Sequence, residues 1–262
     1  MATCKKCGKP LILQGGRCIY CQFPADSYLR GGLQQCARES GKDFQQKQKQ
    51  IITSQSKIDS GQKQYHGHPY IDLGLPSGIK WAICNVGAMN PWEYGGYYAW
   101  GEIEEKDEYN LKSYKYSWPR RYSKYANDAF CDVIDNKWTL EPNDDVAHIK
   151  WGGDWRMPTL KEYEELINNC YHEWTCLNNI RGLKFISKNN GGSLFFPAAG
   201  MRMDRESVNQ GIGYYKSSSL YENNSEGAYV FLFLIDKVSE QSEIHLHSNL
   251  RDLGQSVRPV FK

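Results

Sequence analysis

Apolar residues recur at helical spacing in one well-marked stretch of the chain. Shortly after Trp155, Thr159 and Glu162 have the S/T-x-x-E spacing of a capping box. The apolar positions that follow would share one face of a helix. They are Leu160, Tyr163, Leu166, Ile167 and Cys170. The pattern therefore predicts an amphipathic helix that begins at Leu160 and packs this stripe against a core.

Most other apolar runs are short and end at Gly, Pro, Asn or Ser, which predicts strands joined by turns. Residues 70–87 indicate two strands around a Leu-Pro-Ser-Gly turn, and residues 182–200 a hairpin around Asn-Asn-Gly-Gly. Residues 90–102 indicate a short helix followed by an aromatic strand. Further strands are expected at residues 228–235, which are nearly all apolar, at residues 242–250, which alternate as an edge strand does, and at residues 254–262.

Composition divides the chain into three parts. Residues 1–22 hold four of the nine cysteines, whereas all eight tryptophans lie between Trp81 and Trp174. Residues 23–65 are rich in Gln, Lys and Ser, and we expect a polar, basic linker there, partly helical or disordered. Residues 66–262 are predicted to form one α+β domain of many short strands, few helices and long loops. Such loops on a small scaffold usually carry recognition.

The N-terminal cysteines have the spacing of a structural zinc site. Cys4, Cys7, Cys18 and Cys21 form two C-x2-C pairs, and four thiolates suit a tetrahedral Zn²⁺. We therefore predict a zinc ribbon at residues 1–22, with two disulfides as the alternative. The chain starts with polar and basic residues, unlike a secretory signal, and no apolar run is long enough to span a membrane. These features predict a cytoplasmic protein that holds one structural zinc ion and does not enter a membrane.

Charge is distributed unevenly along the chain. Residues 1–65 contain 11 Lys and Arg against 4 Asp and Glu, whereas the remainder contains 21 against 26. A basic arm of this kind suits nucleic acid or an acidic protein partner, and a solvated linker is the alternative. Because zinc ribbons also dock proteins, we expect a protein partner for the ribbon ahead of nucleic acid.

Six motifs in the predicted α+β domain occur in a recognisable order. They are YIDLGLPSGIKWAICNVGA, GGYYAWGE, DDVAHIKWGGDWRMPTLKEYEEL, SLFFPAAG, GYYKSSS and GQSVRPV. Together they resemble the Fibrobacter succinogenes major paralogous domain, which has a C-type-lectin-like fold of the formylglycine-generating-enzyme-like branch. The resemblance covers about residues 68–262. It implies that the first and last strands pair and that a winding loop region binds a ligand.

Some relatives in this family are variable target proteins of diversity-generating retroelements. In those proteins the binding positions precede a string like GQSVRPV, which corresponds here to residues 201–252. The resemblance, with the Tyr, Asn and Ser content of this region, predicts a ligand-binding set on its loops. The set is Arg202, Asp204, Arg205, Asn209, Tyr214, Lys216, Tyr221, Asn223 and Asn224. Lys216 replaces a tryptophan expected from the family pattern, and ordinary polar loops are the alternative interpretation of the set.

Residues for catalysis are sparse by comparison. His245 and His247 would share one face of a strand, but a catalytic metal needs at least one more ligand. Glu141-Pro142-Asn143 matches a tripeptide of calcium-dependent lectins, yet too few further oxygens accompany it. Cys170 and Cys176 could approach each other and form a disulfide or bind a metal.

The sequence therefore predicts a non-enzymatic protein that presents C-terminal loops to a protein or glycan ligand. The alternatives are a metal-dependent or oxidase-type enzyme on the same fold and a nucleic-acid-binding adapter that uses the basic ribbon.

Overall fold

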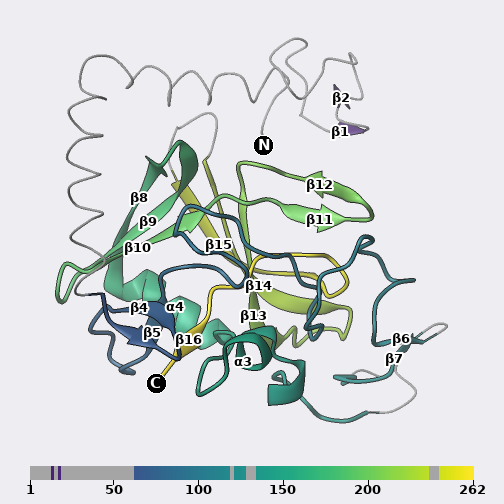
Figure 1. Cartoon of the computed structure of the whole chain (residues 1–262). Helices are drawn as coiled ribbons and strands as arrows, with labels where there is room; N and C mark the ends of the chain where they lie inside the picture. Colours follow the sequence, from purple (N-terminus) through teal and green to yellow (C-terminus); the bar gives the residue numbers. More distant parts are fainter. Residues whose placement is uncertain (1–12, 15–16, 19–61, 119–120, 128–133, 236–241) are drawn as a thin grey trace. The chain divides into compact units, whose positions relative to one another are not determined.

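The computed structural model of the chain describes residues 13–14, 17–18, 62–118, 121–127, 134–235 and 242–262 (Figure 1). The chain divides into two compact units, of which the larger comprises Lys63–Ile235 and Ser242–Lys262. In the N-terminal unit, strands β1 (Leu13–Gln14) and β2 (Arg17–Cys18) pair antiparallel. The remainder of the predicted zinc ribbon and residues 23–61 of the predicted linker lie outside the described residues.

The described part of the larger unit consists mostly of antiparallel sheets with few helices. One sheet has the order β16-β5-β4-β3, so the last strand of the chain joins the first strands of this unit. Its members are β3 (Gln64–Tyr65), β4 (His68–Asp72), β5 (Lys80–Ala82) and β16 (Val260–Phe261). The two strands expected within residues 70–87 are confirmed as β4 and β5. Strand β3 lies just before the predicted domain start at residue 66.

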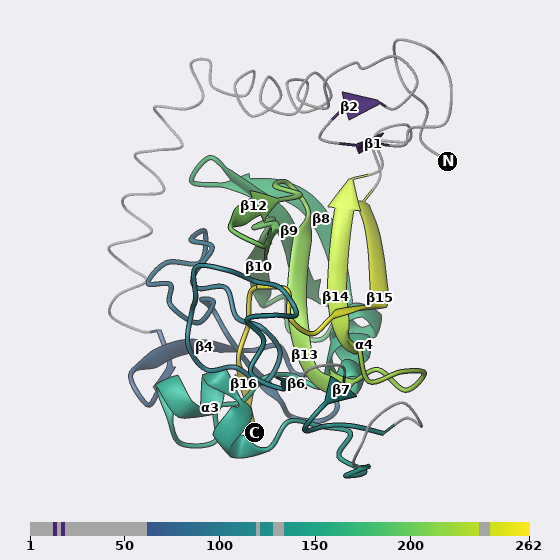
Figure 2. The ribbon, with the colours of Figure 1, turned by 90° about the vertical axis from the view of Figure 1, so that its right-hand side faces the viewer.

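Two three-stranded sheets follow later in the chain, and Figure 2 shows β13, β14 and β15 side by side. The sheet β10-β9-β8 consists of β8 (Cys170–Leu177), β9 (Ile180–Ser187) and β10 (Ser193–Pro197). The sheet β13-β14-β15 consists of β13 (Gly213–Leu220), β14 (Gly227–Ile235) and β15 (Ser242–Leu250). The expected hairpin, the buried strand and the alternating edge strand are thus confirmed.

Two short hairpins and three helical segments complete the described fold. The hairpins are β6 (Ser117–Trp118) with β7 (Arg121–Tyr122) and β11 (Met201–Met203) with β12 (Glu206–Val208). The helical segments are η1 (Pro142–Asp144), α3 (Val146–Trp151) and α4 (Leu160–Asn169).

Helix α4 is the amphipathic helix that the sequence predicts. The Thr159 side chain accepts from the Glu162 N–H and the Glu162 side chain accepts from the Thr159 N–H, which is the capping box. Tyr163 and Leu166 are fully buried, and the Tyr163 ring stacks on Phe231 of β14 at 5.0 Å. The capping box therefore fixes where the helix begins, and its apolar stripe covers one face of the β13-β14-β15 sheet.

Removing the capping hydroxyl tests this account of α4. We expect Thr159→Ala to lower the free energy of unfolding by about 1 kcal/mol, because the Glu162 N–H loses its acceptor. Thr159→Ser keeps the hydroxyl and should cost much less. Urea unfolding of the full chain, followed by tryptophan fluorescence, measures both. Equal losses in the two variants would contradict the capping role.

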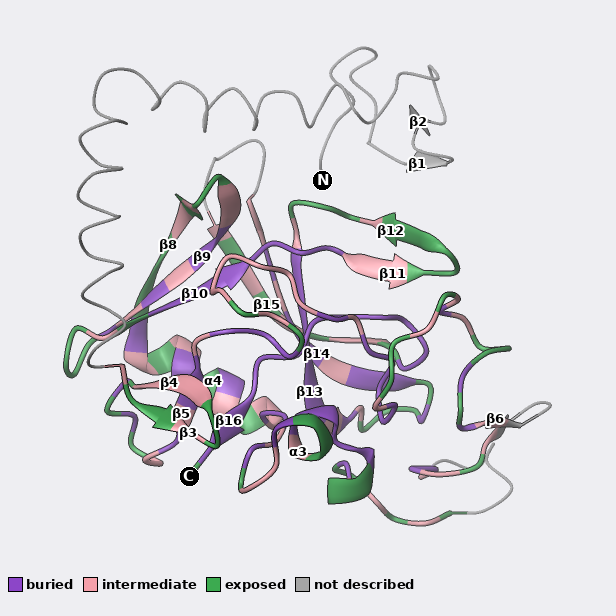
Figure 3. Cartoon of the chain, in the orientation of Figure 1, coloured by how far each residue is buried: buried purple, intermediate pink, exposed green. Residues whose placement is uncertain are grey.

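Two aromatic cores hold the described fold together. Figure 3 colours the buried segments of the chain. One core includes Trp100, Tyr125 and Trp155 among the loops of residues 97–157. The other fills the space between α4 and the sheets and includes Trp81 and Phe196. Because loop residues supply most of the first core, the long loops are part of the packed structure.

The expectation of a helix and an aromatic strand at residues 90–102 is wrong. This segment is a series of turns whose backbone hydrogen bonds go to distant loops, such as Gly96 N to Val86 O at 2.9 Å and Tyr98 N to Gln255 O at 3.0 Å. Gly95 has φ +71°, and a Cβ there would lie 2.4 Å from Val86 O. Glycine is therefore required for close approach of two loops, which neither helix nor strand periodicity reveals.

Candidate ligand-binding face

The β11–β12 hairpin is anchored by backbone hydrogen bonds to two other segments. Arg202 N donates to Gly254 O at 2.7 Å, and Gly254 N donates back to Arg202 O at 3.0 Å. Asp204, at the turn with φ +50°, exchanges two 2.8 Å backbone bonds with Tyr109. These bonds fix the hairpin without using its exposed side chains.

Side chains at the hairpin turn make mainly weak, solvent-exposed contacts. Asp204 Oδ1 accepts from Asn110 Nδ2 at 2.8 Å. The Arg205 guanidinium lies 3.6 Å from a Glu108 carboxylate, but its side chain is 78% exposed, so this pair contributes little stability. Arg202 Nη2 donates to Arg205 O at 3.2 Å. The turn therefore displays charged groups of both signs that are only lightly engaged.

Asn209 and Tyr214 connect the hairpin to the neighbouring sheet. Asn209 Nδ2 donates to the Tyr214 hydroxyl at 3.2 Å, and Asn209 is exposed. Tyr214 lies opposite Leu232 of β14, which lies opposite His245 of β15, so the three share one sheet face. We call Arg202, Asp204, Arg205, Asn209 and Tyr214 the hairpin face.

Lys216 does not belong to a ligand-binding loop, and its prediction is corrected. It lies in β13, its side chain is fully buried, and Nζ has one long contact to Leu250 O at 3.5 Å. Burial lowers the pKa of Lys216 to about 7, although the nearby carboxylates of Asp252 and Glu102 oppose this shift. The sequence GYYKSSS forms a central strand between β14 and the 254–258 segment. Its polar residues therefore do not indicate a loop.

Three predicted residues lie at the opposite end of β13. Tyr221, Asn223 and Asn224 belong to the β13–β14 connection. A strand of eight residues spans about 23 Å, which separates this connection from the hairpin face. Asn223 donates to the Tyr221 hydroxyl at 2.7 Å, and Asn224 Oδ1 accepts from two backbone N–H groups of its own turn. The structure thus divides the nine predicted residues into two sets around the buried Lys216.

Several residues of the hairpin region were missed by sequence reasoning. Met203 is 45% exposed at the turn, and Glu108 and Asn110 reach the hairpin from a loop nearly 100 residues earlier. Leu232 and His245 join it through strand register. The alternation of residues 242–250 could have placed His245 on an outer face. No local signal places the 108–110 loop.

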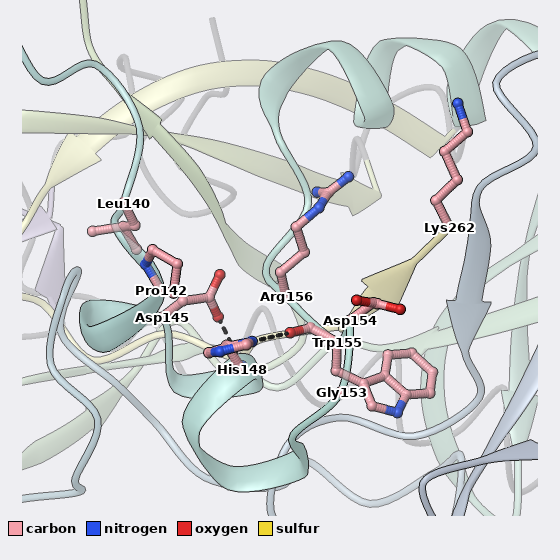
Figure 4. A pocket seen from close by; sticks show the side chains of 9 residues that line it. All are labelled: Leu140, Pro142, Asp145, His148, Gly153, Asp154, Trp155, Arg156 and Lys262. Carbon is pink, nitrogen blue, oxygen red and sulfur yellow. Dashed lines mark hydrogen bonds between the residues drawn. The ribbon is translucent and has the colours of Figure 1, made fainter.

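A hollow of about 440 Å³ lies between η1, α3 and the chain segment before α4 (Figure 4). Asp145 lines it, but its carboxylate accepts from the N–H groups of Ala147, His148 and Met157 at 2.8–3.2 Å. His148 Nδ1 contacts Trp155 O at 3.3 Å. These contacts cap the N-terminus of α3 and join the helix to the segment that follows it. Asp145 and His148 therefore already have partners within the fold.

In the Glu141-Pro142-Asn143 tripeptide, the Glu141 carboxylate forms ion pairs with two lysines. Glu141 pairs with Lys124 at 2.5 Å and with Lys137 at 2.7 Å. The neighbouring Asp144 is buried and pairs with Lys124 at 2.5 Å and Lys115 at 3.2 Å. The carboxylate oxygens that a Ca²⁺ ion would need are therefore bound by ammonium groups.

The buried Asp144 carboxylate contributes to the stability of the fold in a way that depends on pH. Burial opposes its ionisation, but hydrogen bonds from Lys124, Tyr116 and Tyr125 hold the pKa of Asp144 well below its usual range. A depressed carboxyl pKa adds stability above the unfolded value of about 3.9, and this stability is lost as the pH falls below it.

We therefore expect Asp144→Asn to unfold at lower urea than the parent at pH 7, with a gap that narrows below about pH 4. Asp107→Asn is the control, because Asp107 is exposed. A gap that stays constant from pH 7 to pH 3 would contradict the ionic role of Asp144.

The remaining candidate ligands are placed as follows. His245 and His247 are both exposed on one face of β15, as the sequence predicts. Among the residues that the structure describes, no group of three or more His, Cys, Asp or Glu side chains could hold a metal ion. Of the four predicted zinc ligands, Cys18 lies in β2, and Cys4, Cys7 and Cys21 lie outside the described residues. Cys170 is a free buried thiol, so no disulfide joins it to Cys176.

Comparisons with family models, with curated proteins and with solved structures found no match to this chain. The helices within the described ranges are all too short or too polar to cross a membrane.

Proposed function

We propose that this chain is a non-enzymatic binding protein and that the hairpin face holds a protein ligand. The observation that carries this proposal is that the backbone of the β11–β12 hairpin is anchored while several of its side chains are exposed. Its backbone is anchored to Gly254 and Tyr109, whereas the Asp204, Arg205 and Asn209 side chains are exposed. A pre-ordered backbone loses little entropy on binding, and its lightly engaged side chains are available to contact a ligand.

A protein ligand is favoured over a glycan by the shape of this region. The hairpin face continues from the largely buried Tyr214 to Leu232 and the exposed His245, so it forms an extended surface in place of a small enclosed site. The partly buried Leu232 and the exposed Met203 add apolar area between charged groups. This mixture of charged rim and apolar contacts is typical of a protein–protein interface.

The ordered sequence motifs support a C-type-lectin-like fold related to the Fibrobacter succinogenes major paralogous domain. We further propose a variable protein of a diversity-generating retroelement, in which exposed hairpin positions differ between siblings. Arg205 and Asn209 suit this role because neither side chain supports the core.

For the N-terminal unit we propose a docking module held by one structural zinc ion in a reducing, cytoplasmic compartment. The donor set of Cys4, Cys7, Cys18 and Cys21 supports this, because four thiolates are the ligands of a closed structural zinc site. The antiparallel pairing of β1 with β2, which carries Cys18, is compatible with such a module.

A photo-crosslinking amino acid at Arg205 tests the proposed function in cells of the native host. We expect the full chain to form a covalent adduct with one host protein from this exposed position. The same amino acid at Lys161, which is exposed on α4, is the control and should give no such adduct.

The captured protein is then purified and its affinity measured by calorimetry. Arg202→Ala, Arg205→Ala and Asn209→Gly together should weaken binding at least tenfold, since glycine tolerates the φ of +55° at position 209. Lys161→Ala should leave it unchanged. Absence of an adduct, equal adducts from both positions or unchanged affinity of the triple variant would each reject the proposal.

A further inference from the structure

Strand β15 forms one edge of the β13-β14-β15 sheet (Figures 1 and 2). All nine of its residues pair with β14, in continuous register from Ser242 opposite Ile235 to Leu250 opposite Gly227. Beyond that ladder, the backbone of residues 242–249 makes no hydrogen bond to any residue that the structure describes. With respect to the described residues, the outer edge of β15 therefore offers a row of backbone donors and acceptors.

Natural edge strands usually carry features that prevent pairing with another chain, such as lysine, proline or a bulge. The sequence of β15, SEIHLHSNL, has no lysine or proline, and its register with β14 has no bulge. The strand is also longer than most edge strands. These properties make it suited to antiparallel pairing with an identical strand.

Only one antiparallel register pairs all nine residues of two copies, and its two-fold axis passes through Leu246. In this register Ile244 faces Ser248, His245 faces His247 and Glu243 faces Asn249. No two like charges lie opposite each other. The half-buried Leu246 meets its symmetry mate on the face that packs toward the core beneath Phe231. Symmetric pairing is thus compatible in both charge and apolarity.

The same register assembles metal ligands from both copies. One chain presents two exposed imidazoles, with Glu243 Oε2 3.1 Å from His245 Nε2. Opposite residues of an antiparallel pair have Cβ atoms about 4.5–5.5 Å apart, so His245 and the partner's His247 can converge on one ion. With Glu243 beside them, the seam supplies two nitrogens and a carboxylate, which is a recognised ligand set for Zn²⁺. Within one copy, Glu243, His245 and His247 do not form a group that could hold a metal ion, so the second copy is needed to bring an imidazole opposite His245.

We propose that two copies of this chain pair through β15 and that the seam binds divalent zinc between His245 of one copy and the partner's His247. The two-fold symmetry would create a second, identical site, and each of the two zinc ions would link the two edge strands. The proposal does not depend on the identity of any ligand at the hairpin face.

Sedimentation equilibrium of the full chain tests this proposal, with Zn²⁺ alone as the probe. One equivalent of zinc per chain allows for the four N-terminal cysteines, and three equivalents saturate the seam as well. We expect the mass to double between these two conditions. His245→Ala with His247→Ala should remain monomeric at three equivalents. His172→Ala is the matched control, because His172 is an exposed histidine on β8, the edge of another sheet.

Hydrogen–deuterium exchange then shows where the copies meet. Amide exchange of residues 243–248 should slow at least tenfold when the mass doubles, because the outer N–H groups gain partners. A mass that does not respond to zinc, equal dimerisation of the double-histidine variant, or dimerisation without protection of β15 would each overturn the proposal.

Discussion

Replacing Arg251 with methionine is expected to lower the free energy of unfolding by about 3–5 kcal/mol, the largest loss that we anticipate for a single substitution. Arg251 is fully buried, and its guanidinium donates to four oxygens at 2.9–3.1 Å. The acceptors are the Tyr114 hydroxyl and the carbonyls of Tyr125, Ser225 and Lys124. Methionine would fill part of the volume but would remove all four of these hydrogen bonds to buried oxygens.

Aromatic rings around the same guanidinium add to this effect. The carbon Cζ lies 4.5 Å from the ring centroid of Tyr122 and 4.8 Å from that of Trp100. Cation–π contacts in desolvated sites contribute about 2 kcal/mol. Arg251 therefore joins the 122–125 loop, the 225 turn and the end of β15 at one point.

Urea unfolding of the full chain measures this prediction, and Arg205→Met is the control. Arg205 is largely exposed, so its loss should change the unfolding free energy by less than about 0.5 kcal/mol. Similar losses in the two variants would show that the Arg251 contacts do not carry the stability assigned to them.

Replacing Lys216 with methionine is expected to stabilise the protein below pH 7. Burial lowers the pKa of Lys216 from 10.5 to about 7, and this difference corresponds to at most about 5 kcal/mol of stability lost when the amine is charged. Between these two pH values the unfolded chain binds more protons than the folded chain, so the parent gains stability as the pH rises. Methionine removes the charge and retains most of the apolar volume.

The stability gain of Lys216→Met should therefore be large at pH 6.5 and small near pH 10. Urea midpoints of parent and variant at these two pH values measure it. Lys161→Met, at an exposed position of α4, should show no such dependence. A destabilised Lys216→Met at pH 6.5 would mean that the ammonium makes compensating contacts in the folded state.

Local patterns predicted the elements whose contacts are mainly local or repetitive. The capping box and the apolar stripe located α4, because its first turn and its buried face depend on residues within one helix. Alternation located β15, whose inner residues Ile244 and Leu246 face the core. The Asn-Asn-Gly-Gly turn located the β9–β10 hairpin, because the two strands that pair are adjacent in sequence.

The rest of the fold depends on partners that are distant in sequence. The turns at residues 90–102 are held by the 254–258 segment, whose own hydrogen bonds also pair with β13. This second partner makes β13 a central strand, so the polar residues 216–218 are buried. Sequence reasoning treated the same string as loop and therefore included Lys216 in the binding set.

The candidate site was only partly accessible from the sequence. The region 201–224 contains the hairpin face, but strand β13 divides that region and carries Tyr221, Asn223 and Asn224 to its other end. The pattern of residues along the sequence does not predict which end of a strand faces a ligand. The hairpin contacts from Tyr109 and Asn110 required the folded chain.

Amide exchange of the full chain, with and without the purified protein identified by crosslinking, tests most directly whether the ligand binds at the hairpin face. We expect slower exchange at residues 201–214 and unchanged exchange at residues 221–226 when the partner is bound. Protection of residues 221–226 with no change at residues 201–214 would contradict it and assign binding to the opposite end of β13.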